Sequence, residues 1–549
     1  MKFTGKFLGY LLCIFFVPAA GGVGPTPAPF AIVNPVLDTG GHPVEAVAPN
    51  GKTYPVFRRT PESPLVAALR SVLGSGQAQQ ELELERYART LAAGEVGSRN
   101  AAALAPMYLL LSTEEGGYAR WGFWMEGANG HRDLIMAGYV DMVVDQSSIG
   151  TGGFEEIFCH ELGHLILRSL LGDLSHGPSR KMHQGMTVTD YPTAFDEGYA
   201  EHFQPLVRDS TTNSILRKIQ AGTGPMDMDL LWISNFDGQL RSDGVKRNLF
   251  VHRKAPPHTD PSEDSDRYQA FVREETSGQF LPGVFKNAQE MMASEGVIST
   301  LFYRLVNRES LRNHYREAAF YRQFLQASVD PTAGAQSVVS PYANINLKLF
   351  AAMRQIANRS GDPGCPLAIA LLNAYAKLFP DEAKSAYGVF LDTTYGVTAS
   401  PEVASRFERA STAGHLGDLE SYRENSHAAF TLLDQITDRV AKGELALDAN
   451  LGPEIWLLND DFKIARAVWE KQRTLPLSFN LNAASEAELM TLPGVDLQLA
   501  KRLTATRHSR GYYRSLDEMG SVEGVSPALL TVMKTMAERM KAAGMYTRQ

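Results

Sequence analysis

Hydrophobic positions recur with two different periods in the first 210 residues of the chain. Apolar runs rich in β-branched and aromatic side chains predict strands, and they cover residues 107–111, 120–125 and 134–144. Apolar residues spaced three and four apart predict helices, and they cover residues 64–93, 154–171 and 193–207. This part of the chain is therefore expected to combine a sheet with helices.

The remaining segments have other patterns. Residues 23–62 hold short runs broken by glycine and proline, which predicts an extended or β-structured N-terminal segment. Residues 210–473 are mainly helical by pattern, and residues 474–478 are typical of a linker. Residues 477–541 contain two similar helix-turn-helix units, for which we expect N-caps at Asn482 and Ser515.

The N-terminus has the layout of a secretory signal peptide. Lys2 and Lys6 precede an apolar run of about 11 residues, which is short of the roughly 20 residues that span a bilayer. Small residues follow, so we predict a signal peptide over residues 1–22 and a secreted or periplasmic protein. An uncleaved N-terminal anchor is the alternative, and no later segment resembles a membrane span.

Composition narrows the class of protein. The chain has 549 residues, 44% of them hydrophobic, which is ordinary for a globular protein and excludes a collagen-like or mainly disordered chain. The net charge of −8 argues against a molecule that binds nucleic acid over its whole surface. Three cysteines exclude a disulfide-rich scaffold, and Cys159 and Cys365 are expected to be two separate buried thiols.

The predicted helix at residues 154–171 carries the sequence His160-Glu161-Leu162-Gly163-His164. Residues four apart lie on one helix face, so both imidazoles can reach one ion, and zinc prefers such nitrogen ligands. Glu161 lies beside the first histidine and could accept a proton from a zinc-activated water. The motif therefore predicts a zinc hydrolase with Glu161 as its general base.

Together with Asp196-Glu197-Gly198, this motif resembles the thermolysin-like (gluzincin) metallopeptidases. The resemblance implies a zincin-like catalytic domain at residues 63–209, with a mixed sheet and an active-site helix. It also implies Glu197 as the third zinc ligand and Glu201 as the carboxylate that orients His160. The implied fold class is α+β, with the mainly helical region and a small all-α domain following the catalytic domain.

Several roles stay open at this point. His176, His183, Asp190 and Asp196 are rival metal ligands, because the gap between His164 and Glu197 is long for the family. The expected oxyanion donors are Tyr199 and His202, with His252, His258 and Tyr268 as further candidates. The resemblance also implies that residues 134–144 form an edge strand that holds the backbone of a peptide or protein substrate.

Two exopeptidase features of the family are missing from the chain. Ala293-Ser294-Glu295-Gly296 lacks the tyrosine of the aminopeptidase donor helix, and Gly127-Ala128-Asn129-Gly130 is only a weak match to the element that binds a free N-terminus. We therefore expect an endopeptidase rather than an aminopeptidase.

The C-terminal units at residues 477–541 resemble the paired helix-hairpin-helix domain of secreted bacterial competence-type DNA-binding proteins. The resemblance implies phosphate contacts at Gly494, Val495 and Gly524, with Lys501 and Arg502 nearby. Asp496 and Ser526 replace the last glycine of each turn, and a carboxylate repels phosphate. The expected partner is thus either DNA, bound weakly and without sequence preference, or a protein. If the zinc site were only structural, the chain would be a non-catalytic exported binding protein.

Overall fold

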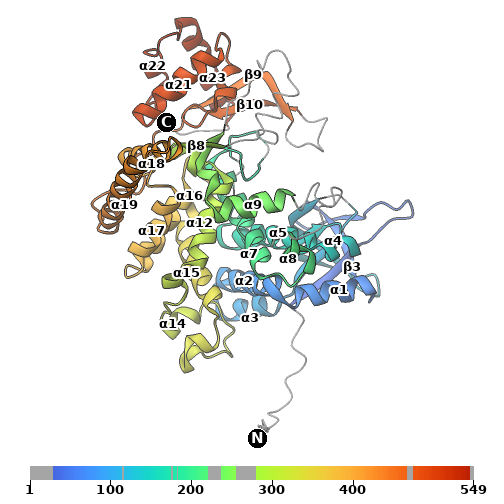
Figure 1. Cartoon of the computed structure of the whole chain (residues 1–549). Helices are drawn as coiled ribbons and strands as arrows, with labels where there is room; N and C mark the ends of the chain where they lie inside the picture. Colours follow the sequence, from blue (N-terminus) through green and yellow to red (C-terminus); the bar gives the residue numbers. More distant parts are fainter. Residues whose placement is uncertain are drawn as a thin grey trace, which may run out of the picture.

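A six-stranded sheet lies at the N-terminal end of the molecule (Figure 1). The structure is a computed structural model, and it describes residues 29–113, 116–174, 177–181, 183–220, 236–254, 280–465 and 474–544. The predicted signal peptide at residues 1–22 lies outside these ranges. The strands are β1 (Phe30–Pro35), β2 (Glu45–Val47), β3 (Thr53–Arg59), β4 (Met107–Leu111), β5 (Gly117–Glu126) and β6 (Arg132–Met142).

The sheet closes on itself. Its strand order is β1-β4-β6-β5-β3-β2, and β1 also pairs with β3, so five strands form a ring. Phe57, Phe123 and Tyr139 pack against one another in a buried aromatic cluster of these strands. The strand predicted at residues 107–111 is β4, and the other two predicted strands fall within or overlap β5 and β6. The N-terminal segment 23–62 does not stand apart, because β1 and β3 belong to the same sheet as β4–β6.

Helices cover the sheet and surround α5, which carries the His-Glu-x-x-His sequence. They are α1 (Pro64–Leu73), α2 (Gly76–Ala93), α3 (Val96–Leu104), α4 (Gln146–Thr151), α5 (Gly153–Leu171), α6 (Tyr191–Glu201), α7 (Phe203–Ser210) and α8 (Ser214–Gln220). Gly152 and Gly172, both at positive φ, flank α5. The helix predicted at residues 193–207 is two helices, α6 and α7, which meet at His202.

The next region is mainly helical, as predicted, and shares one large core with α5 and the sheet. Its one described hairpin joins β7 (His252–Lys254) and β8 (Phe280–Phe285). Its longer helices are α9 (Phe236–Lys246), α12 (Glu295–Asn307), α15 (Pro341–Ile356), α16 (Leu367–Leu378), α17 (Ala383–Thr393), α18 (Pro401–His415) and α19 (Leu419–Ala441). The short turns of helix are α11 (Ala288–Met292), α13 (Glu309–Arg312) and α14 (Ala318–Tyr321).

The C-terminal helices have a hydrophobic core of their own. They are α20 (Glu486–Met490), α21 (Leu497–Arg510), α22 (Leu516–Met519) and α23 (Pro527–Ala542). The antiparallel strands β9 (Trp456–Ala465) and β10 (Thr474–Asn480) precede them and belong to the same domain. The prediction of a linker at residues 474–478 is wrong, because these residues belong to β10. Leu477 and Phe479 of this strand are buried in the C-terminal core.

The two expected N-caps of the C-terminal units have different outcomes. Ser515 occupies the N-cap position of α22 as predicted, although its side chain makes no capping hydrogen bond, whereas Ser485 caps α20 in place of Asn482. The Asn482 amide instead donates to the carbonyls of Pro453 and Tyr513, so this residue ties together three segments of the chain.

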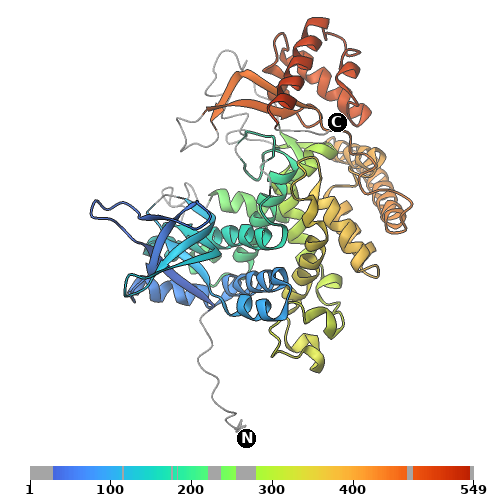
Figure 2. The ribbon, with the colours of Figure 1, turned by 180° about the vertical axis from the view of Figure 1, so that it is seen from behind.

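The C-terminal domain packs on the rest of the protein beside β8 (Figures 1 and 2). Lys181 Nζ lies 3.1 Å from Glu488 Oε1, and both side chains are almost fully buried. Arg507 donates to Glu290 of α11 at 2.9 Å. Within the described residues, no helix is long and apolar enough to cross a membrane.

Candidate metal centre

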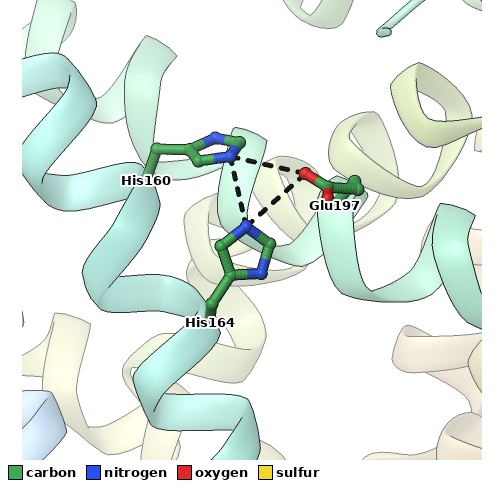
Figure 3. Close-up of side chains that lie close together, drawn as sticks. All are labelled: His160, His164 and Glu197. Carbon is green, nitrogen blue, oxygen red and sulfur yellow. Dashed lines mark hydrogen bonds and ion pairs between the residues drawn. The ribbon is translucent and has the colours of Figure 1, made fainter. Parts of the chain in front are cut away.

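Helices α5 and α6 bring three predicted ligands to one point (Figure 3). His160 Nε2 lies 3.3 Å from His164 Nε2, and each of these nitrogens lies 3.5 Å from Glu197 Oε2. All three side chains are buried or nearly so, and their ligand atoms face one another.

These distances fit a metal ion better than they fit hydrogen bonds. A tetrahedral zinc ion with bonds of about 2.0–2.1 Å separates its ligand atoms by about 3.3–3.4 Å. Charge-assisted hydrogen bonds between nitrogen and oxygen are shorter, at about 2.7–2.9 Å. The three atoms therefore form one face of a tetrahedron and could hold a zinc ion with a fourth position left for water or substrate.

Two glycines let the helices that carry these ligands approach closely. A Cβ on Gly163, within the motif, would lie 2.9 Å from Cα of Ala200 on α6. A Cβ on Gly198 would lie 2.7 Å from the Glu295 carbonyl oxygen on α12. Larger residues at either position would push α6 away from a neighbour, so the place of Glu197 depends on both.

The side chains behind the ligands differ from the expectation. Asp196 Oδ1 lies 2.9 Å from His164 Nδ1, a hydrogen-bond distance that fixes the ring with Nε2 toward the centre. The neighbour of His160 Nδ1 is the Gln204 amide at 3.5 Å, not the Glu201 carboxylate. Glu201 is fully buried, and its carboxylate lies against Gly185 of the loop before α6. The offset of four residues predicted the wrong side chain because Glu201 faces that loop and not α5.

Glu161, the expected base, faces the beginning of β5. A Cβ on Gly117 would lie 3.1 Å from Glu161 Oε1, and only 9% of Glu161 is exposed. Glu161 is therefore buried between α5 and the start of β5.

The histidines and carboxylates of the site shift one another's pKa values. Burial lowers the pKa of His164, but the carboxylates of Asp196 and Glu197 outweigh burial and raise that pKa well above its usual value. Burial raises the pKa of Glu197, but His183 and His164 outweigh it and hold that pKa well below its usual value. The site therefore holds negative charge that attracts either protons or a metal ion.

His183, one of the rival ligands, lies beside Glu197 but outside the group of three. Its Nδ1 is 3.3 Å from Glu197 Oε2 and 3.5 Å from Oε2 of Glu295, at the first residue of α12. Burial lowers the pKa of His183, yet the two carboxylates raise it to about 9. Sequence reasoning missed Gln204, which lies in no motif, and it considered Glu295 only as part of a string that lacks the aminopeptidase tyrosine. His176 lies outside the described residues.

Asp190, another rival ligand, does not point to the metal centre. It caps α6 by accepting from the backbone N–H of Thr193. Asp196 binds His164 from behind and is not itself a member of the ligand group.

The expected oxyanion donors Tyr199 and His202 are in the core. Both are fully buried and pack against Phe302 of α12, away from the three ligands. His202 donates from Nδ1 to the Tyr199 carbonyl, and burial lowers its pKa to about 3. These two predictions are wrong because contact with α12 decides which face of α6 is internal. Of the further candidates, His252 packs on Phe285 of the β7–β8 hairpin, while His258 and Tyr268 lie outside the described residues.

The strand predicted to hold substrate is not at an edge. β6 pairs with β4 on one side and with β5 on the other, so its backbone is used within the sheet. β5 lies closer to the centre, because its first residue, Gly117, contacts Glu161 and Ile157 of α5.

The C-terminal hairpins place the predicted phosphate contacts in different surroundings. Gly494 and Gly524 are exposed at positive φ in the turns, and Val495 is buried as an apolar anchor. Asp496 accepts from the backbone N–H of Leu499 at 2.7 Å, so its own carboxylate occupies the N-terminus of α21. Arg502 donates to the Glu523 carbonyl, while Lys501 is exposed.

Comparisons with known proteins recognise this C-terminal part. A family model described as a helix-hairpin-helix motif matches residues 478–536. No curated protein and no solved structure matches the chain. The protein is a mixed α+β chain that carries a C-terminal helix-hairpin-helix domain, a motif compatible with binding to DNA or protein.

Proposed function

We propose that the chain is an exported zinc-dependent peptidase of the gluzincin type. The observation that carries this proposal is the triangle of His160, His164 and Glu197, whose edges of 3.3–3.5 Å match the ligand spacing of a tetrahedral zinc ion. Bound zinc would lower the pKa of a water toward neutrality and polarise a carbonyl oxygen. Export rests on the signal peptide that the sequence predicts at residues 1–22.

Other residues of the chain carry out proton transfer, ligand orientation and substrate binding. Glu161 accepts the proton of the attacking water and passes it to the leaving nitrogen. Asp196 holds the ring of His164 in the orientation that presents Nε2. The substrate backbone lies along the beginning of β5, next to Glu161, because β5 pairs there with β6 alone of the described strands and reaches β3 only at Trp124 and Met125. Arg241 of α9 donates to Gln204 at 3.4 Å, and Gln204 lies at Nδ1 of His160, so these two residues support the His160 ring from the side away from the metal ligands.

Substitution of Glu161 by Gln tests the catalytic step. We expect Glu161→Gln to retain zinc and to slow peptide hydrolysis by on the order of 10²–10⁴-fold. The assay is mass spectrometry of a peptide mixture with blocked N-termini, which an endopeptidase cleaves and an aminopeptidase does not. Glu424→Gln, at an exposed position, is the matched control. Unchanged turnover in Glu161→Gln would remove Glu161 from the mechanism.

A second candidate function belongs to the C-terminal domain, and the helix-hairpin-helix match favours it. In this alternative, the chain binds DNA or a protein partner and the zinc only stabilises the fold. Asp496 weighs against DNA, because it places a carboxylate where a phosphate would bind. We therefore infer that any DNA binding is weak and lost at moderate salt.

A further inference from the structure

A second group of ligand atoms shares Glu197 with the first. His183 Nδ1 lies 3.3 Å from Glu197 Oε2, the same oxygen that faces His160 and His164. The same His183 Nδ1 also lies 3.5 Å from Glu295 Oε2. These separations again exceed those of charge-assisted hydrogen bonds and match the spacing of ligands around one ion.

Glu295 is the strongest sign that this group is built for a cation. Its side chain is 1% exposed, and apart from the His183 contact neither carboxylate oxygen has a hydrogen-bond partner in the described part of the chain. A buried carboxylate without compensation is costly. Within the described residues, Glu295 is compensated by His183 and, from beyond ion-pair distance, by the charge of Arg241, and a cation bound between Glu295 and His183 would add to both.

Another group of one histidine and two carboxylates provides a contrast. His314, Asp381 and Glu382 also lie close together, but the chain supplies its own cations to them. Lys348 Nζ is 2.6 Å from Glu382, and Arg316 is 2.7 Å from Asp381. No Lys or Arg side chain of the described residues forms an ion pair with Glu197 or Glu295.

Backbone contacts hold the two halves of the second group together. Gly296 N–H donates to the Gly185 carbonyl at 3.0 Å, and Thr189 N–H donates to the Ala293 carbonyl at 2.8 Å. The loop that carries His183 therefore lies along the start of α12. The buried Lys181–Glu488 pair fixes the same loop to the C-terminal domain.

We propose that His183, Glu197 and Glu295 bind a second divalent cation, with the carboxylate of Glu197 bridging it to the first. This inference rests on the proposed function, since Glu197 serves both ions. Two-metal hydrolytic sites place their ions about 3.5–4 Å apart, which one bridging carboxylate allows. The second cation would bind a part of the substrate that the first cation does not contact. The two ions would then hold the scissile bond between them.

The test is zinc stoichiometry in the full chain. Protein stripped with a chelator is dialysed against defined free zinc, and bound zinc is counted by mass spectrometry. We expect two ions per chain in the wild type and one in both His183→Ala and Glu295→Gln. His183 is half-exposed, so its variant folds even if the buried Glu295→Gln variant does not. His131→Ala, at an exposed histidine, is the control and keeps two ions.

Other outcomes separate the two proposals. One zinc in the wild type, kept in His183→Ala and lost in His160→Ala, overturns the second site and leaves the peptidase proposal intact. One zinc that both variants lose makes His183 a ligand of a single ion and also overturns it. No zinc in any protein overturns both. Manganese gives an independent readout, because a pair sharing Glu197 has an exchange-coupled paramagnetic resonance spectrum and His183→Ala restores that of an isolated ion.

Discussion

The metal centre and the C-terminal hairpins use their polar groups in opposite ways. At the centre, His160, His164 and Glu197 point their ligand atoms at one another at distances longer than those of charge-assisted hydrogen bonds. In the first hairpin, the Asp496 carboxylate already binds the N-terminus of α21. A site with unsatisfied ligands is prepared for an ion, whereas a turn capped by its own carboxylate is not prepared for phosphate.

The two regions are also joined. Lys181 and Glu488 connect the loop of the metal centre to the first hairpin through a buried ion pair. Arg507 reaches Glu290 of α11, just before the helix that begins with Glu295. The helix-hairpin-helix domain thus supports the segments on both sides of the centre, which is a role for it that needs no DNA.

The largest expected effect in this comparison is the loss of stability on breaking the ion pair between Lys181 and Glu488. Lys181→Met leaves the Glu488 carboxylate buried without its partner, which costs about 3–5 kcal/mol in the free energy of unfolding. Denaturant unfolding measures the loss, and hydrogen exchange should locate faster opening in residues 177–190. The double variant Lys181→Met/Glu488→Gln removes the unpaired buried charge as well and should recover part of the stability. Equal stability of wild type and Lys181→Met would show that the domains are held together elsewhere.

A smaller effect is expected from the residue that orients His164. Asp196→Ala removes the acceptor of its Nδ1 and should weaken zinc binding by about 10–100-fold. Competition with a chromophoric chelator measures the affinity. Asp173→Ala removes an exposed carboxylate near the same helix and should leave it unchanged. If both variants bind zinc like the wild type, Asp196 has no part in the centre.

The smallest effect concerns the hairpin. Asp496→Gly restores the glycine of the family turn and frees the N-terminus of α21, at a cost of only a few tenths of a kcal/mol in capping. We expect duplex DNA to bind severalfold more tightly at low salt, measured by fluorescence anisotropy. Ser526→Gly, in the second hairpin, exchanges an uncharged cap and should change affinity less. No gain in Asp496→Gly would favour a protein partner.

The sequence predicted local features well and long-range contacts poorly. The helix of His160 and His164 follows from its apolar spacing, and Glu197 follows from a resemblance in a short motif. Tyr199 and His202 failed because the buried face of α6 is set by α12, about a hundred residues later. The prediction of β6 as an edge strand is wrong because β6 pairs in parallel with β4, a contact that no local pattern encodes. The prediction of a linker in place of β10 is wrong because Pro476 and the short length of the segment hide the alternation of Leu477 and Phe479.

The central claim is that His160, His164 and Glu197 hold zinc. Its most direct test is the zinc content of the purified mature chain, with Glu197→Ala and the exposed control Glu424→Ala beside it. The account predicts at least one tightly bound zinc ion per chain in the wild type and the control, and its loss in Glu197→Ala. No zinc in the wild type after supplementation, or the same content in Glu197→Ala, would contradict it.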